Sequence, residues 1–237
     1  MTRELQKDLM QHASDYRKRA NEYFFKTGPG EYGEGDQFAG IQMPSIRSAI
    51  KHYLDMSLLG INEMLYHEIH EFRMAALLIL GHQYKKAKDP FQQEEICAFY
   101  LKHKSQVNNW DLVDLSAPHI LGQHILNQNF LNKEVLFVLV NSPVLWDRRI
   151  AMVSTLAFIR KGYLELCFQL AELLLDDKED LMHKALGWML REAWKRDSLT
   201  VEEFIKEHYA RLPRTSLRYA IERMEPVQRK SYLKGSF

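Results

Sequence analysis

Apolar residues recur at intervals of three and four positions along almost the whole chain, and this spacing is typical of amphipathic helices. No series of strands with period-two alternation interrupts it. Pro44 and Pro143 stand where helices should begin, and Gly162 stands where one should end. We therefore predict an all-α protein with helices within 5–27, 44–57, 70–87, 93–104, 132–141, 148–162, 163–177, 179–197, 201–212 and 215–225.

Two of these stretches, 72–80 and 150–159, are apolar on nearly every side. Helices of this kind are buried between neighbours, as in the inner layer of a solenoid. Short connections between the helices favour stacked helix pairs, so we expect a right-handed α-solenoid of HEAT-like repeats over a single domain, residues 1–237. An irregular helical bundle is the alternative, because the repeats are degenerate and periodicity alone does not decide.

The segment 28–40 is the one long irregular stretch, and it holds five of the 11 glycines. Its first six residues spell G-x-G-x-x-G, which binds dinucleotides only between a strand and a helix. Here the preceding residues are charged and helical, and Glu31, Glu34 and Asp36 would repel phosphate. We therefore interpret 28–40 as a glycine-rich connection between helices and predict no cofactor.

Composition and cysteine usage indicate where the protein functions. Hydrophobic residues make up 46% of the chain, enough for a substantial core. Cys97 and Cys167 lie in apolar helical stretches, which predicts buried thiols in a reducing compartment. The charged N-terminal residues are unlike a secretory signal, and no apolar run has the length of a membrane span. We expect a soluble, cytoplasmic protein.

Charge is unevenly distributed along the chain. The net charge is +1, but residues 181–237 contain 12 lysines and arginines against seven acidic residues. A basic C-terminal quarter suggests an anionic partner, although a solvated helix face with a chance bias would look the same.

The stretch 108–114, "NNWDLVD", offers the first candidate chemistry. Asn108 or Asn109 is a plausible N-cap, and Asp111 in the first turn is most simply explained as helix-end chemistry. Trp110 and Asp114 are four residues apart and share a helix face. Among apolar neighbours the Asp114 carboxylate requires either a partner, as in a buried ion pair, or a function.

Two further stretches carry arginine and tryptophan. Arg148 and Arg149 point about 100° apart on a helix, so only one can face a given surface, and a surface salt bridge is the simpler role. Trp188 follows Gly187 and has a cation one turn to each side. A core position is the commoner role for such a residue, but the arrangement also suits nucleic acid. The flanking cations are Lys184 and Arg191.

His67 and His70 are three residues apart, so they do not form the H-E-x-x-H zinc motif, and we assign no metal. No nucleophile elbow and no diagnostic Cys–His pair is present.

Taken in order, the stretches 23–44, 70–77, 110–114, 148–152 and 184–192 resemble the AlkD-like DNA alkylation repair family, bacterial DNA glycosylases built from HEAT-like repeats. The resemblance runs from about Tyr23 to Arg218. It implies a concave basic groove that binds double-stranded DNA containing alkylated purines, with the protein at the nucleoid when bound. The size of a single domain suggests a monomer. It also implies release of 3-methyladenine or 7-methylguanine for base excision repair, without base flipping.

The resemblance assigns roles to matching positions. Asp114 matches the catalytic carboxylate, Trp110 and Trp188 match the tryptophans that line the groove, and Arg149 matches a phosphate-binding arginine. Their joint presence favours an active member. Asn109 departs from members that carry an aromatic residue there. The DNA-binding residues implied or suggested by charge are Arg47, Arg148, Lys184, Arg191, Arg214 and Arg218.

Two other functions fit the same scaffold. A non-catalytic protein that binds DNA structures would bind duplex or branched DNA without releasing a base. A solenoid that binds proteins would have no salt-dependent affinity for DNA and would hold a peptide instead.

Overall fold

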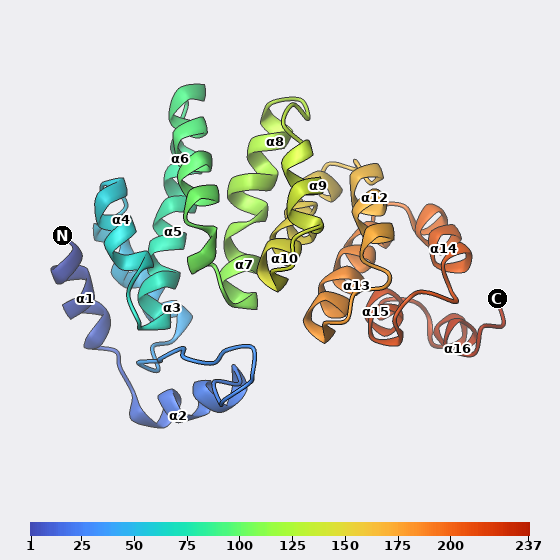
Figure 1. The fold of residues 1–237 in the computed structure, drawn as a ribbon, viewed down its shortest axis with the longest axis horizontal. Coiled ribbons are helices and arrows are strands. Elements are labelled where there is room, and N and C mark those ends of the chain that lie inside the picture. Colours follow the sequence, from blue (N-terminus) through green and yellow to red (C-terminus); the bar gives the residue numbers. More distant parts are fainter. The chain divides into compact units, whose positions relative to one another are not determined.

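The computed structural model describes every residue from Met1 to Phe237, and the chain is helical throughout (Figure 1). It contains α-helices and short 3₁₀ and π turns. The only β-type pairing is an isolated parallel bridge between Gln37 and Ile69. The predicted all-α fold class is confirmed. None of the helices combines the length and the apolar character that a membrane span requires.

The chain divides into two compact units, Met1–Ile120 and Leu121–Phe237. In the first unit α5 is the central helix, and it packs against α3, α4, α6 and α7. Its buried residues include Phe72, Leu77 and Leu80, as the all-round apolar pattern predicts. The helices of this unit are α1 (Thr2–Met10), α2 (Asp15–Phe24), α3 (Met43–Ala49), α4 (Leu58–Leu65), α5 (His70–Lys86), α6 (Pro90–Lys102) and α7 (Trp110–Ser116).

In the second unit α13 is the central helix, and it packs against α10, α11, α12, α14 and α15. The apolar stretch 150–159 is fully buried in it, as predicted. The helices of this unit are α8 (Gln123–Asn127), α9 (Glu134–Val140), α10 (Leu145–Ser154), α11 (Leu156–Ile159), α12 (Glu165–Leu173), α13 (Asp180–Trp194), α14 (Ser198–Glu207), α15 (Arg214–Ala220) and α16 (Pro226–Lys234).

The prediction of one helix over 5–27 is wrong, because α1 ends at Met10 and a second helix, α2, begins after Ser14. Ser14 adopts an extended conformation, and its side-chain oxygen accepts the amide hydrogen of Arg17, which begins α2. Its own amide donates to the Ala39 carbonyl at 2.9 Å, so the glycine-rich segment is docked at this break. A distant contact therefore sets the boundary between α1 and α2.

The predicted helix over 148–162 is interrupted at Thr155. The hydroxyls of Ser154 and Thr155 donate to the carbonyls of Ile150 and Met152, at 2.7 and 2.6 Å, and bonds of this kind bend helices. The predicted helix over 44–57 is also shorter, because α3 ends at Ala49 and a 3₁₀ turn follows. The sequence pattern does not predict helices α4, α8 and α16.

Candidate functional site

Helix α7 presents the two residues that the sequence singles out in the first unit. Asn109 caps it, with its side-chain oxygen 2.8 Å from the Trp110 amide, which confirms the expected N-cap. Leu112 and Val113 are fully buried against the unit. Trp110 and Asp114 are each only half-buried, so α7 turns its Trp110–Asp114 face away from the core.

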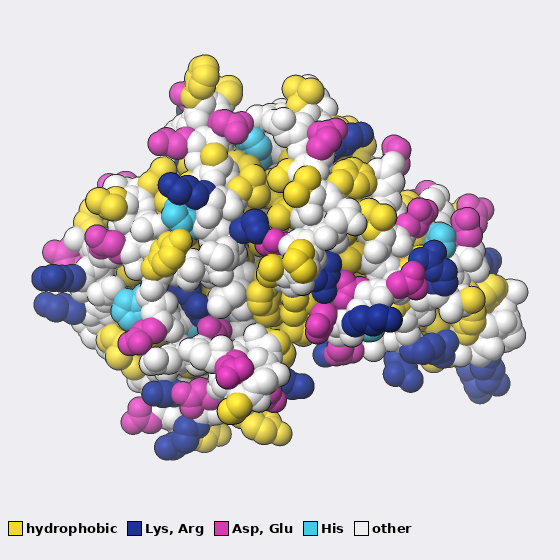
Figure 2. All heavy atoms as spheres, in the orientation of Figure 1, with side chains coloured by type: hydrophobic (Ala, Val, Ile, Leu, Met, Phe, Trp, Pro, Cys, Tyr) yellow, Lys and Arg dark blue, Asp and Glu magenta, His cyan; other side chains and the backbone are white.

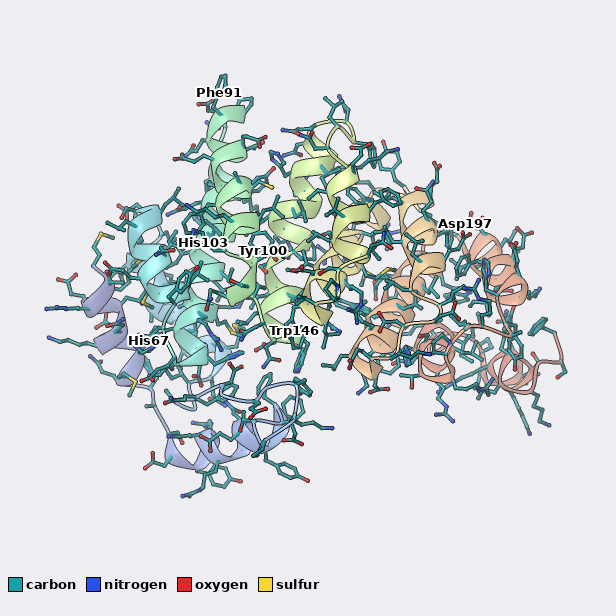
Figure 3. The ribbon with its side chains drawn as sticks, viewed as in Figure 1. His67, Phe91, Tyr100, His103, Trp146 and Asp197 are labelled. Carbon is teal, nitrogen blue, oxygen red and sulfur yellow. The ribbon has the colours of Figure 1, made fainter.

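Helix α6, where Figure 3 labels Tyr100, also contacts α7. The Tyr100 hydroxyl lies 3.1 Å from the Ser116 hydroxyl, and both groups are buried. Burial raises the pKa of Tyr100 above its usual range, and the charge of Asp114 acts in the same direction. The carboxylate of Asp114 is thus close enough to this pair to influence it electrostatically.

A series of aromatic rings lies behind Trp110. Phe25 stacks on Trp110 with ring centroids 5.3 Å apart and an interplanar angle of 17°. Phe38 stacks on Phe25 at 4.9 Å, and His70 stacks on Phe38 at 4.6 Å. Phe24 adds an edge contact to Trp110 at 6.0 Å while its own ring is 63% exposed. Phe24 and Phe25 at the end of α2 therefore support the indole, and Phe38 of the glycine-rich segment packs behind Phe25.

The last ring of the series, His70, belongs to a buried cluster of charges. Its Nδ1 lies 3.2 Å from Asp36 Oδ2 and its Nε2 lies 2.8 Å from Asp111 Oδ2. Arg73 donates to Asp36 Oδ1 at 2.5 Å, and the Asn109 amide donates to Asp36 Oδ2 at 3.0 Å. We call Asp36, His70, Arg73, Asn109 and Asp111 the His70 cluster.

Charges within the His70 cluster stabilise one another. Burial disfavours protonation of His70, but Asp111 and Asp36 outweigh it and raise the pKa of His70 to about 9. Burial would likewise raise the pKa of Asp36, but His70, Arg73 and Asn109 lower the pKa to about 2. His70 and Asp36 are therefore both charged at neutral pH. Asp111 is not simply part of the helix end, as the sequence suggests, because it pairs with His70.

Glu71, beside His70, anchors the glycine-rich segment. Its buried carboxylate accepts the amide hydrogens of Ala39, Gly40 and Ile41 at 2.9, 2.8 and 3.1 Å. The segment 28–40 is therefore a connection between helices, as predicted, and its C-terminal end is fixed to α5.

In the second unit, Trp188 lies half-buried on α13. The preceding residue explains the Gly-Trp pair, since a Cβ on Gly187 would lie 2.4 Å from the Ser216 carbonyl oxygen of α15. Glycine therefore permits close packing of α13 against α15 and leaves the neighbouring indole partly accessible.

Arg148 and Arg149 have different environments. Arg149 is 4% exposed and donates to the Leu181 carbonyl at 2.6 Å. Arg148 donates to Asp177 at 2.6 Å through Nε and to the carbonyls of Ser142 and Pro143 at 3.0 Å. These bonds give Arg148 a structural role, and its contact with DNA stays a prediction.

The other cations predicted to bind DNA differ in whether they already have a partner within the protein. Lys184 pairs with Asp180 at 2.7 Å on the surface, and Arg191 pairs with Glu222. Arg214 donates to the Leu233 carbonyl at 2.8 Å. Arg47 in the first unit and Arg218 in the second are exposed and make no ion pair. Figure 2 shows lysine and arginine side chains gathered over the C-terminal helices.

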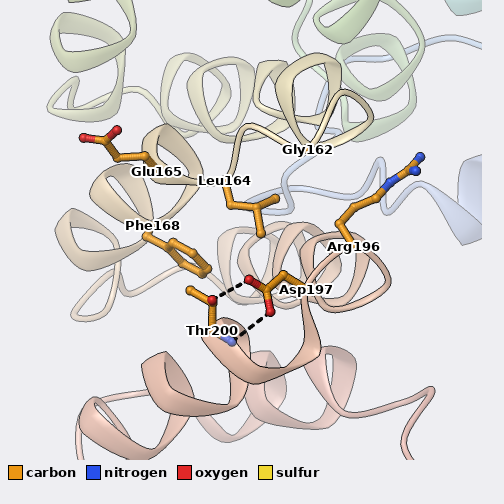
Figure 4. A pocket seen from close by; sticks show the side chains of 7 residues that line it. All are labelled: Gly162, Leu164, Glu165, Phe168, Arg196, Asp197 and Thr200. Carbon is orange, nitrogen blue, oxygen red and sulfur yellow. Dashed lines mark hydrogen bonds between the residues drawn. The ribbon is translucent and has the colours of Figure 1, made fainter.

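A separate pocket in the second unit contains none of the predicted residues. It is lined by Gly162, Leu164, Glu165, Phe168, Arg196, Asp197 and Thr200 (Figure 4). The Asp197 carboxylate is engaged in capping α14, where it accepts the amide and hydroxyl hydrogens of Thr200 at 3.2 and 2.5 Å.

Comparison with known proteins agrees with the resemblance seen in the sequence. A comparison with curated proteins finds no match. A solved structure described as a predicted DNA alkylation repair enzyme from Enterococcus faecalis has a TM-score of 0.73 and 18% identity to this chain. It covers 91% of this chain and 98% of that one, and so has the same fold. The family model for DNA alkylation repair enzymes matches residues 5–224, and the chain therefore belongs to the DNA alkylation repair enzyme family.

Proposed function

We propose that this protein is a DNA glycosylase that releases N3- and N7-alkylated purines from duplex DNA. Membership of the DNA alkylation repair enzyme family supports a role in alkylation repair. The observation that carries the finer assignment is the face of α7, where Trp110 and Asp114 are only half-buried while Leu112 and Val113 are fully buried. A carboxylate next to an indole on an accessible face is suited to stabilising a cation.

The chemistry of the substrate explains why so few groups are needed. An N3- or N7-alkylated purine already carries a positive charge, so it leaves without a strong general acid. As the glycosidic bond lengthens, positive charge develops on the deoxyribose. We assign Asp114 to stabilising that charge, directly or through a water molecule that it positions. Trp110 offers its π face to the same cationic sugar.

For two residues of the second unit, only the resemblance to the family supports a role in the proposed site. We assign Trp188 to the backbone of the damaged nucleotide and Arg149 to a nearby phosphate. The exposed Arg218 is suited to a phosphate contact, as is Arg47 in the first unit. Lys184 and Arg191 could exchange their partly exposed partners, Asp180 and Glu222, for phosphate, because surface ion pairs contribute little stability.

The direct test is to incubate the protein with methylated duplex DNA and to identify free bases by chromatography. We expect wild-type protein to release 3-methyladenine or 7-methylguanine. Asp114→Asn should reduce release by about 100-fold or more, the typical effect of removing one electrostatic stabiliser, while duplex affinity is retained. Asp55→Asn, which changes an exposed carboxylate of the same unit, is the matched control.

Each negative outcome identifies a different function. Salt-dependent duplex binding with no released base from wild-type protein would indicate a DNA-binding protein without glycosylase activity. Absence of any affinity for DNA would favour a scaffold that binds proteins. Unchanged turnover of Asp114→Asn would remove Asp114 from the mechanism.

A further inference from the structure

His70 connects three segments that lie far apart in the sequence. It is the first residue of α5, its ring is 1% exposed, and both ring nitrogens face carboxylates. Asp36 comes from the glycine-rich segment and Asp111 from α7. Nε2 faces the Asp111 carboxylate and so donates a hydrogen to it, whereas Nδ1 lies between Asp36 and the Arg73 guanidinium, which is 3.3 Å away. The two carboxylates favour the charged imidazolium over the neutral ring.

Two structural connections link the His70 ring to Trp110. The first is covalent, since Asp111 directly follows Trp110 in the first turn of α7. The second passes through the stacked rings of Phe38 and Phe25, the latter of which covers Trp110. His70 thus supports both the start of α7 and the ring that backs the indole.

We propose that His70 is a positioning residue that holds Trp110, and with it Asp114 one turn further along α7, in the orientation that base release requires. This inference rests on the proposed function. His70 is buried and acts only through Asp111 and the two phenylalanines. A purely structural cluster would instead change stability without changing the chemistry at Trp110 and Asp114.

The charged groups around His70 determine which part of the site responds when the ring loses its proton. Asp36 faces it from the glycine-rich segment, Asp111 from α7, and Arg73 from α5. Glu71, adjacent on α5, is occupied by three backbone amides. Loss of the charge leaves Asp36 paired with the Arg73 guanidinium and with Asn109. It removes the cationic partner of Asp111, which then keeps only a neutral imidazole and the Leu112 amide at 2.8 Å. Deprotonation therefore acts mainly on α7 and Trp110.

The first experiment measures base release under single-turnover conditions between pH 7 and pH 10, after subtraction of non-enzymatic release. For wild-type protein we expect a plateau and then a fall with a midpoint near pH 9, toward about one tenth of the plateau rate. His70→Gln should release base about tenfold more slowly at pH 7 and should lack the alkaline fall. Affinity for unmodified duplex should change by less than about twofold, because His70 does not contact DNA.

The second experiment needs no DNA. Near-ultraviolet circular dichroism of wild-type protein minus that of Trp110→Phe isolates the signal of Trp110, which should change with a midpoint near pH 9. In the His70→Gln background the same difference should not titrate there. Tyr53→Phe is the control, since it removes the 2.5 Å hydrogen bond to Asp8 elsewhere in this unit and should leave both pH profiles unchanged.

The outcomes separate the two proposals. Wild-type release rates for His70→Gln, or a flat wild-type profile and an unchanging Trp110 signal through pH 9, would overturn the positioning role. If wild-type protein releases no base at any pH, the glycosylase assignment fails, and the Trp110 signal decides the positioning role alone. If His70→Gln does not fold, the two wild-type profiles decide it.

Discussion

The imidazole of His70 is both buried and charged, and this combination makes the stability of the protein depend on pH. Its pKa is about 9 in the folded protein, against 6.5 for an unperturbed histidine. The stabilisation is therefore complete below pH 6.5 and is lost as the pH rises through 9. A shift of this size corresponds to about 3 kcal/mol of unfolding free energy.

We predict that the unfolding free energy of wild-type protein, measured in urea, falls more between pH 7 and pH 10 than that of His70→Gln. The difference between the two proteins should shrink by about 3 kcal/mol over this range. Comparing the two removes the contribution of tyrosines and cysteines that titrate in both. A constant difference would mean that His70 is neutral in the folded protein.

Single residues are predictable from the sequence where their partners are local. Asn109 is an expected N-cap because it precedes an apolar helix, and it bonds to the next residue. His70 finds its carboxylates 34 and 41 positions away, which no local pattern encodes. In the sequence Asp36 is only a charge that repels phosphate, so its pairing with Arg73 and His70 is missed.

At the level of elements, the glycine-rich segment connects α2 to α3 and also supports α7. Gly40 shows why the segment requires glycine at this position. Its φ is +74°, and a Cβ there would lie 2.3 Å from the Ser14 carbonyl oxygen. Gly30 also has a positive φ, of +76°, but a Cβ there would meet nothing within 4 Å.

We therefore predict that Gly40→Ala lowers the unfolding free energy by about 3 kcal/mol, because backbone strain is added to overlap with α2. Gly30→Ala, the matched control, should cost about 1 kcal/mol from strain alone. Thermal or urea unfolding of both variants measures this. Equal effects would show that the segment moves away from α2 without cost.

Helices are predicted well where burial is symmetric and poorly where tertiary contacts set their ends. The stretches 72–80 and 150–159, which are apolar on nearly every side, form buried helices. The break at Ser14 depends on a bond from Ser14 to Ala39, which the sequence pattern of 5–27 cannot reveal. Helix type follows from local periodicity, and helix boundaries follow from the fold.

For the molecule as a whole, the distribution of charge predicts how DNA binding should respond to salt. Each phosphate contact releases counterions, so loss of one contact should reduce the slope of log affinity against log salt concentration by about 0.9. We expect Arg218→Ala to show this reduction on unmodified duplex. Arg160→Ala, another exposed arginine of the second unit that is outside the predicted set, should leave the slope unchanged.

Fluorescence anisotropy titrations at several salt concentrations measure both slopes. Equal slopes for wild-type protein and Arg218→Ala would place Arg218 outside the DNA contact. The net charge of +1 gives no indication of salt-dependent DNA binding. The sequence predicts it only through the excess of basic residues after position 180.

The two cysteines have a consequence for survival under the stress that creates the proposed substrate. Both thiols are buried, and burial raises the pKa of each to about 12. Small electrophiles that methylate DNA attack thiolates rather than thiols, and almost no thiolate exists here at neutral pH. The two thiols are thus protected from the agents whose products in DNA this protein is proposed to remove.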